Sequence, residues 1–206
     1  MWVVKLGGSL ARSSRLQDWL AVLAEHGAGR SIIVPGGGPF ADLVRAEQAR
    51  AGIRDNAAHR MAILAMEQFG FMIEGLQPEL CAAATETELH GALAMARVPV
   101  WLAYPMIIRD VTLPEDWSVT SDSLALWLAL HLKAEALLLV KSARLPDGPA
   151  DIASLSASGA LDTHFPLLAR QYAGEIRWLG PDECDQVKQG FEAGVPPGKR
   201  LGIAAS

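Results

Sequence analysis

The sequence predicts an α/β fold, in which short buried strands alternate with helices. Two apolar runs, at residues 1–6 and 31–34, have the length of strands buried on both faces, and each leads into a turn of consecutive glycines. Apolar residues at the three-four spacing of a helix follow each turn. Strand, glycine turn and helix thus occur twice within about fifty residues, an order typical of a layered α/β domain.

The helices of the first half are predicted from apolar stripes at helical spacing. After the first turn, the stripe comprises Trp19, Leu20, Leu23 and Ala24, and Gly27 ends the helix. After the second turn, the stripe comprises Phe40, Leu43, Val44 and Ala51. A third helix begins after the capping residues Asp55 and Asn56, and its stripe comprises Ala62, Ile63, Met66 and Phe69.

In the second half, further strands are predicted at residues 98–102 and 136–140. Between them, Thr120, Ser121 and Asp122 begin another helix. Beyond residue 141 we expect a turn at 146–148, a helix near 166–172, and strands at 175–179 and near 201–204. The chain contains no internal repeat and no low-complexity linker, so we expect a single domain over residues 1–206.

Composition excludes several classes of protein. The 206 residues carry a formal net charge of −5 and no dense Lys/Arg cluster, which argues against a sequence-independent nucleic-acid binder. Cys81 and Cys184 have neither the spacing of a zinc site nor that of a disulfide framework, so a reducing cytoplasm fits and no metal site is expected. No apolar stretch is long enough to cross a bilayer, so no membrane association is expected.

Lys5 is the most informative residue, because it lies inside the first strand and directly before a glycine turn. Lys141 stands in the same way at the end of the run 136–140. Desolvating an ammonium group is costly unless an anion meets it, so both positions indicate chemistry on an anionic substrate. The alternative is that each lysine reaches solvent from a strand end.

The two glycine turns are candidate phosphate sites. Glycines after a strand let backbone N–H groups approach phosphate oxygens, and a following helix N-terminus favours negative charge. Neither turn matches the Walker pattern or the GxGxxG fingerprint, which disfavours the common phosphate-loop folds and a nicotinamide-dependent oxidoreductase. Taken alone, each run of glycines is also consistent with a tight turn that binds no ligand.

Together these motifs resemble those of the amino acid kinase superfamily. Residues 4–9 (VKLGGS) resemble its first-strand motif, residues 34–39 (VPGGGP) its second glycine turn, and residues 120–123 (TSDS) its Asp-bearing helix start. Lys141 and Ser142, followed by Asp147 and Gly148, resemble the nucleotide region. The resemblance implies a three-layer α/β/α sandwich around a central, mainly parallel sheet of about eight strands.

The resemblance also implies ATP-dependent phosphoryl transfer, with Mg²⁺ bridging the phosphates and no dedicated protein cage for the metal. Lys5, Asp122 and Lys141 would be catalytic, with Asp122 holding both ammonium groups. Nucleotide-binding residues would be Gly7, Gly8, Ser9, Ser142, Asp147 and Gly148, and acceptor-binding residues Gly36, Gly37, Gly38, His59, Thr120 and Ser121. Residues 1–120 would lie mainly on the acceptor side and residues 121–206 mainly on the nucleotide side. Taken alone, Asp122 has an alternative role: an acidic residue in the first turn that interacts favourably with the helix dipole.

Within the superfamily, residues 59–66 and 119–123 look most like the branch that phosphorylates aminomethylfuranyl-methyl phosphate to its diphosphate in methanofuran-type cofactor synthesis. Residues 161–166 (LDTHFP) resemble a segment of that branch, to which we assign no role. His59 has two interpretations: it binds the acceptor's phosphate, or it packs under a neighbouring loop with one nitrogen bonded to backbone.

Other functions stay open at this point. The acceptor could instead be isopentenyl phosphate, UMP or an amino-acid carboxylate. The same fold could serve as a non-catalytic oxyanion or nucleotide storage or sensor protein, although such a role predicts loss of the Lys5, Asp122 and Lys141 set. ATP is implied only by the resemblance, because residues 151–159 match no base pocket. Members of the superfamily often associate, so we expect a homo-oligomer.

Overall fold

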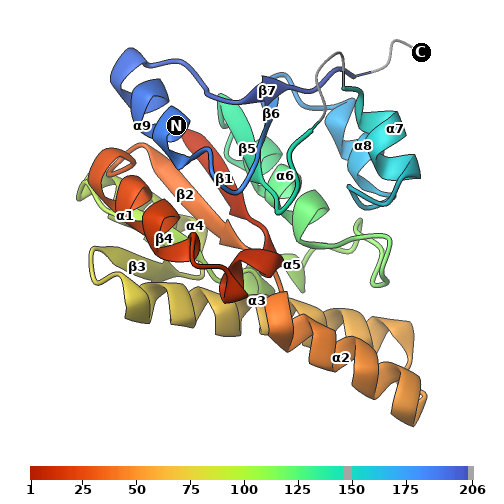
Figure 1. Ribbon diagram of the computed structural model, residues 1–206. Coiled ribbons are helices and arrows are strands. Elements are labelled where there is room, and N and C mark those ends of the chain that lie inside the picture. The colour runs from red at the N-terminus through yellow and green to blue at the C-terminus, as the bar shows by residue number, and fades with distance from the viewer. Residues whose placement is uncertain (146–149, 204–206) are drawn as a thin grey trace.

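The computed structural model describes residues 1–145 and 150–203, and its centre is one mainly parallel sheet (Figure 1). Seven strands of the described residues lie in the order β3-β4-β2-β1-β5-β6-β7, and only β7 runs antiparallel to its neighbour. The mainly parallel α/β fold is therefore confirmed, with seven described strands where about eight were expected. The strands are β1 (Trp2–Leu6), β2 (Ser31–Pro35), β3 (Leu80–Ala83), β4 (Val98–Trp101), β5 (Ala136–Val140), β6 (Glu175–Leu179) and β7 (Lys199–Arg200).

Helices cover both faces of the sheet, which makes the three layers. One face packs against α1 (Leu16–His26), α3 (Asp55–Leu76) and α9 (Cys184–Ala193). The other packs against α4 (Glu86–Ala94), α5 (Tyr104–Ile107), α6 (Ser121–His131), α7 (Ile152–Ala157) and α8 (Phe165–Ala169). A short 3₁₀ helix, η1 (Gly8–Arg12), follows β1. No helix of the described residues is both long and apolar enough to span a membrane.

The central strands β1, β2 and β5 are fully buried, as their continuous apolar runs predict. Alternate residues point to opposite faces. Val3 and Leu137 belong to the core on the α6 face, whereas Val4 and Leu138 belong to the core on the α1 face. This alternation places Lys5, two residues after Val3, on the α6 face.

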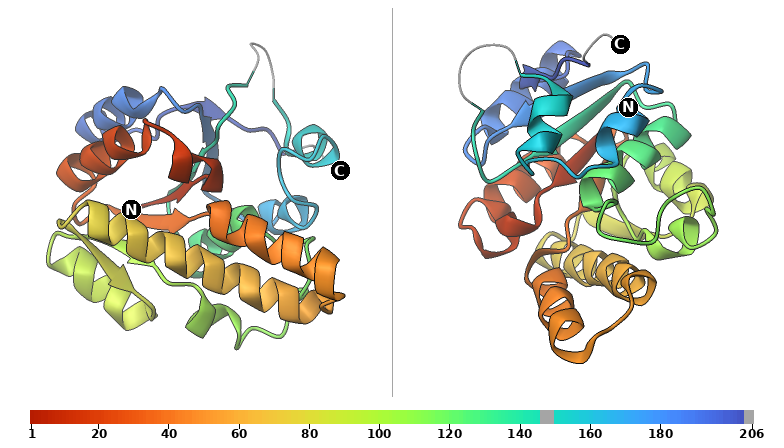
Figure 2. Two further views of the ribbon diagram at one scale, coloured as in Figure 1. Left: turned by 60° about the horizontal axis from the view of Figure 1, so that its bottom comes forward. Right: turned by 90° about the vertical axis from the view of Figure 1, so that its right-hand side faces the viewer.

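Helix α2 (Gly38–Ala51) packs along part of the longer α3 as a helical hairpin, and α2 extends beyond the sheet (Figure 2). The helix predicted around Leu43 is confirmed, but the Leu43 side chain itself is 63% exposed. The reason is that α2 packs against α3 rather than against the sheet, through a narrow contact that includes Ala41 and Val44. The apolar stripe of α2 is therefore only partly buried.

The edges of the fold differ from the sequence prediction. Strand β3 and the helices α4, α5, α7 and α9 were not predicted, because β3 has only four residues and the helices are short with few buried positions. The final strand lies at Lys199–Arg200 rather than near 201–204, where Gly202 forms an isolated bridge with Asp151. Helix α8 covers Phe165–Ala169, within and just before the predicted range.

The two glycine turns pack directly against each other. A Cβ atom on Gly8 would lie 2.3 Å from Gly38 N, and one on Gly36 would lie 2.4 Å from Gly8 N. Gly38 also has a positive φ of 53°, which L side chains rarely adopt. The glycines are therefore needed for the close approach of two loops, in addition to any contact with a ligand.

We predict that Gly8→Ala destabilises the fold by about 1–3 kcal/mol, because its methyl group overlaps backbone that has no room to move. Gly75→Ala, in the last turn of α3, is the matched control: apart from the adjacent backbone of α3 itself, no atom lies within 4 Å of the position that its methyl group would take, so alanine should stabilise by up to about 1 kcal/mol. Urea denaturation of both variants measures the difference. Equal stability of the two would contradict the packing argument.

Candidate active site

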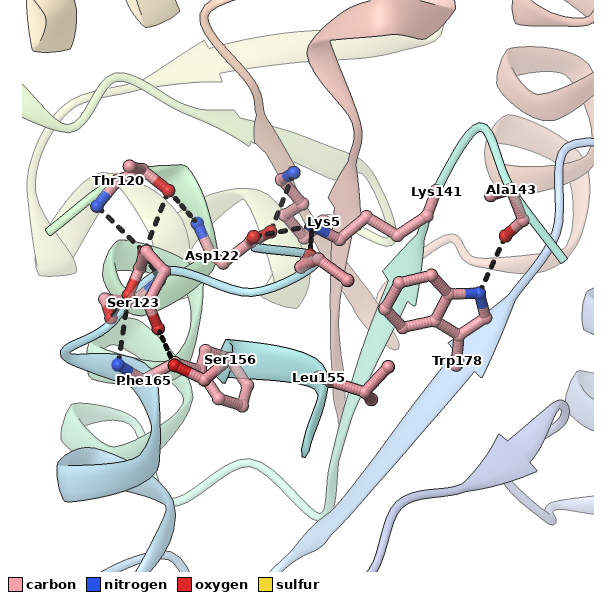
Figure 3. Close-up of polar contacts among 12 residues, drawn as sticks. Lys5, Thr120, Asp122, Ser123, Lys141, Ala143, Leu155, Ser156, Phe165 and Trp178 are labelled. Atoms are coloured by element: carbon pink, nitrogen blue, oxygen red, sulfur yellow. Dashed lines mark hydrogen bonds and ion pairs between the residues drawn. The ribbon is translucent and has the colours of Figure 1, made fainter. Parts of the chain in front are cut away.

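Three charged residues meet beside the carboxyl ends of β1 and β5. Lys141 Nζ donates to Asp122 Oδ2 at 2.5 Å, and Lys5 Nζ lies 2.9 Å from Asp122 Oδ1 (Figure 3). The Lys5 contact is an ion pair without hydrogen-bond alignment, so Oδ1 has no hydrogen-bond donor among the described residues. All three side chains are largely buried. The structure thus brings together the predicted catalytic set.

The topology explains why these distant residues meet. Strands β1 and β5 are parallel neighbours, and Lys5 lies opposite Leu139. Lys141 is two residues beyond Leu139, so both lysines belong to the α6 face near one edge of the sheet. Helix α6 packs against β1 on that face and offers Asp122 from its first turn. This is the edge at which open α/β sheets bind ligands.

Lys141 has further contacts that fix its position. Its Nζ also donates to Ala160 O at 2.8 Å and lies 5.5 Å from the centre of the Trp178 ring. The Trp178 indole is itself oriented by a 2.9 Å hydrogen bond to Ala143 O, as Figure 3 shows. The ammonium group is therefore held from three sides.

Burial and charge act against each other in this cluster. Burial alone would raise the pKa of Asp122, but the positive charges of Lys5 and Lys141 outweigh it and lower that pKa below its ordinary value. Burial and the neighbouring Lys5 lower the pKa of Lys141 from 10.5 to about 8, although Asp122 acts in the opposite direction. Near neutral pH the carboxylate is ionised and Lys141 is still mostly protonated.

A cavity of about 310 Å³ opens beside Lys5 and Asp122. Of the predicted acceptor-binding residues, Gly37, Gly38, His59, Thr120 and Ser121 line it. Gly8 and Ser9, predicted on the nucleotide side, line it as well. Lys141 does not belong to its lining, so Asp122 separates a cavity on the Lys5 side from the Lys141 side.

The other predicted residues lie elsewhere. The backbone amides of Gly7 and Gly36 continue the hydrogen bonding of the sheet. Gly7 N donates to Val140 O and Gly36 N donates to Leu6 O, each at 2.9 Å. Ser142 is exposed next to Lys141. Asp147 and Gly148 lie outside the described residues. The binding roles assigned to these residues remain predictions.

His59, from the first turns of α3, combines features of both interpretations. Its Nδ1 lies 2.9 Å from Asp116 O, and the side chain is buried, as the packing interpretation requires. The same side chain lines the cavity, as the binding interpretation requires. Burial lowers the pKa of His59, so the free protein holds it neutral with Nδ1–H donating to the carbonyl.

Several polar residues of the site were not predicted. Arg12, Asp42, Arg45 and Trp117 line the same cavity. The guanidinium of Arg45 lies 4.3 Å from the centre of the Trp117 ring and its Nη1 3.5 Å from Asp42 Oδ1. Arg12, Asp42 and Arg45 each lie within about two turns of a glycine turn, and this proximity could have identified them.

Comparison with known proteins identifies the family. The sequence profile of the amino acid kinase family matches residues 1–144, which include Lys5, Asp122 and Lys141. The chain belongs to the amino acid kinase family. Its expected class, a phosphotransferase acting on small molecules, is thereby confirmed.

One relative of this amino acid kinase is the [5-(aminomethyl)furan-3-yl]methyl phosphate kinase of Methanocaldococcus jannaschii. The two are 25% identical over 185 residues, which cover 84% of each chain. This similarity confirms the resemblance, noted from the sequence, to the aminomethylfuranyl-methyl phosphate kinase branch.

Solved structures confirm the fold. The uridylate kinase of Archaeoglobus fulgidus superposes with a TM-score of 0.70 at 14% identity, covering 98% of this chain and 99% of the other. An isopentenyl phosphate kinase superposes with a TM-score of 0.63 at 16% identity, covering 98% and 100%.

We predict that Asp122→Asn destabilises this kinase by about 3–5 kcal/mol near pH 6, because two buried ammonium groups lose their counter-charge. Without the carboxylate, the pKa of Lys141 in the folded variant falls below its wild-type value of about 8, whereas in the unfolded chain it stays near 10.5. Between these two pKa values the unfolded variant binds more protons than the folded variant, so the variant's free energy of unfolding rises with pH. The stability deficit of the variant relative to wild type therefore narrows toward about pH 8.

Asp182→Asn is the matched control for this experiment. Asp182 also contacts two cations, Arg15 and Arg144, but at the surface. Its loss should leave stability nearly unchanged at both pH values, because exposed pairs are screened by water. Urea denaturation at about pH 6 and about pH 8 measures the stability of both variants. A stability deficit of Asp122→Asn that does not change with pH would argue against charge as the cause.

Proposed function

We propose that the protein transfers the γ-phosphoryl group of ATP to a small phosphomonoester, most specifically [5-(aminomethyl)furan-3-yl]methyl phosphate, and forms its diphosphate in methanofuran-type cofactor synthesis. The observation that carries the proposal is the buried Lys5–Asp122–Lys141 cluster with a cavity on its Lys5 side. Similarity to the M. jannaschii enzyme supports the choice of acceptor.

The cluster suits in-line phosphoryl transfer between two anionic reactants. An oxygen of the acceptor's phosphate attacks the γ-phosphorus, the bond to the bridging oxygen breaks, and ADP leaves with that electron pair. The attacking oxygen is already ionised, so the protein mainly has to position the reactants and neutralise charge. Lys5 neutralises the acceptor side of the transferred group and Lys141 the nucleotide side, while Asp122 holds both ammonium groups in place.

The cavity has the chemistry to bind such an acceptor. Arg12, Arg45 and His59 supply cationic or ionisable groups for a phosphate. The apolar part of the wall, which suits a furan ring, includes Ala62, Ile63, Met66, Val119 and Leu124. Asp42 adds an exposed carboxylate for an ammonium group. The acceptor named above carries all three of these features: a phosphate, an aromatic ring and an amine.

We propose that MgATP binds with its phosphates at Lys141 and Ser142, beyond Asp122, and at the glycine turn of residues 7–9, whose Gly8 and Ser9 also line the acceptor cavity and so lie between the two substrates. Asp122 is already engaged by two ammonium groups, so we propose that Mg²⁺ is held by the nucleotide phosphates rather than by this carboxylate. In this arrangement residues 1–120 supply most of the acceptor side and residues 121–206 most of the nucleotide side of a single domain. We also propose a cytoplasmic homo-oligomer.

Two alternatives have different support. UMP or isopentenyl phosphate as acceptor is favoured by the fold similarity alone. A storage or sensor protein for oxyanions would need the cationic cavity but not the second lysine behind Asp122. The buried and fully assembled cluster favours catalysis over such a role.

The proposal predicts transfer of labelled phosphate from MgATP to [5-(aminomethyl)furan-3-yl]methyl phosphate, with a higher kcat/KM than for isopentenyl phosphate or UMP. Lys5→Ala should lower kcat by roughly 100-fold or more, because it removes charge stabilisation at the transferring group. Lys188→Ala is the control, since Lys188 is an exposed lysine of α9. Preference for UMP or isopentenyl phosphate would keep the chemistry and reject the acceptor, and absence of all transfer would reject the kinase proposal.

His59 should make acceptor binding depend on pH. As a neutral imidazole with Nδ1–H bonded to Asp116 O, it offers the cavity only a lone pair, so it must gain a proton to donate to a phosphate. We expect KM for the acceptor to rise with pH as this protonated form is lost, and because burial lowers the pKa of His59, the rise should begin below the ordinary histidine pKa of about 6.5. His59→Gln should flatten the curve to that of the phosphate's own titration. Identical curves for wild type and His59→Gln would show that His59 only packs.

A further inference from the structure

One carboxylate outside the cavity organises the start of helix α6. Asp162, in the loop between α7 and α8, accepts hydrogen bonds from Thr120 N and Thr120 Oγ1, each at 2.8 Å, and from Ser123 N at 3.0 Å. It also accepts a bond from Ser123 Oγ, and one at 3.0 Å from Phe165 N. Thr120 and Ser123 flank Asp122 on both sides.

The same loop also contacts the other partner of Asp122. Ala160 O, two residues before Asp162, accepts the 2.8 Å hydrogen bond from Lys141 Nζ. Ser156 Oγ donates to Asp162 O at 3.1 Å and ties the loop to α7. The segment 160–162 therefore touches both the helix start that carries Asp122 and the ammonium group that Asp122 binds.

We propose that Asp162 is a positioning residue, which keeps Asp122 and Lys141 in the geometry that transfer requires. This inference rests on the proposed kinase function, and it assigns a role to the segment 161–166 that the sequence left without one. Asp162 does not line the cavity, so it acts through α6 and the Ala160 carbonyl rather than on a substrate.

A carboxylate is required here for two reasons. All five contacts of the Asp162 side chain come from donors, and only an ionised carboxyl group offers acceptors in every direction. Four of the five donors, from Thr120 and Ser123, are at the start of α6, where the helix dipole also favours negative charge. An asparagine would turn an NH₂ group toward one of these donors, and a misplacement of the reacting groups by about 1 Å can cost about 100-fold in rate.

The test compares Asp162→Asn with Asp151→Asn in the full chain. Asp151 is the matched control, because its carboxylate also caps a helix of the same region, accepting from Ser154 N at 2.8 Å, but contacts neither α6 nor Lys141. We expect Asp162→Asn to lower kcat by about 10- to 100-fold with KM for either substrate changed less than about threefold. Asp151→Asn should leave kcat within about twofold of wild type. Equal kcat in both variants would overturn the proposal.

A second readout does not require activity. The chain has only five lysines, so the ¹³Cε signal of Lys141 can be followed in lysine-labelled protein and assigned with Lys141→Arg. The negative charge of Asp162 favours the protonated Lys141, so its loss should move the Lys141 titration, and the alkaline limb of kcat, to lower pH.

These two readouts separate the possible failures. If Asp162→Asn unfolds more easily but Lys141 titrates as in wild type, Asp162 is merely structural and the proposal is overturned. If the wild-type protein transfers no phosphate, the proposed function fails, and the Lys141 titration alone decides whether Asp162 positions the cluster. Thermal unfolding confirms that the variant is folded at the temperature of both measurements.

Discussion

The burial of one carboxylate between two ammonium groups is the constraint around which the site is built. Removing three charges from water is costly, and the cost is offset only if each group finds its partner in a well-defined geometry. Asp122 meets this requirement by contacting Lys141 through one oxygen and Lys5 through the other. Each ammonium group comes from a different strand, so the sheet, α6 and the loop after β5 must all be in place before the cluster can form.

The parallel sheet provides this arrangement because its neighbouring strands end at one edge. Lys5 lies in β1 and Lys141 directly follows the adjacent strand β5, on the face that α6 covers. The two glycine turns at the same edge approach each other so closely that side chains do not fit between them, which brings the start of η1 and the start of α2 to one cavity. The requirement for glycine thus has a structural cause that exists before any phosphate binds.

Local sequence predicted the parts of the fold that are governed by local physics. The buried strands, the glycine turns and the lysines inside or after apolar runs are visible in short windows, and so was the helix start at Asp122. Asp162 was recognised only as part of a motif, because the donors it binds are about forty positions earlier in the chain and no spacing reveals them. The exposure of Leu43 could not be predicted for a similar reason. Whether α2 packs on the sheet or only on α3 is decided by tertiary structure, not by its own apolar stripe.

The charge balance of the cluster connects structure to chemistry. Lys5, Lys141 and Asp122 alone carry one excess positive charge, and this excess contributes to the lowered pKa of Lys141. Asp162 supplies a nearby negative charge that acts in the opposite direction, and its side chain does not line the cavity beside Lys5. A second carboxylate beside Lys5, in addition to Asp122, would compete with the transferred phosphoryl group for the same ammonium. By holding its compensating charge at the start of α6, the fold can keep Lys141 protonated near neutral pH while the Lys5 side of the cluster stays open to phosphate.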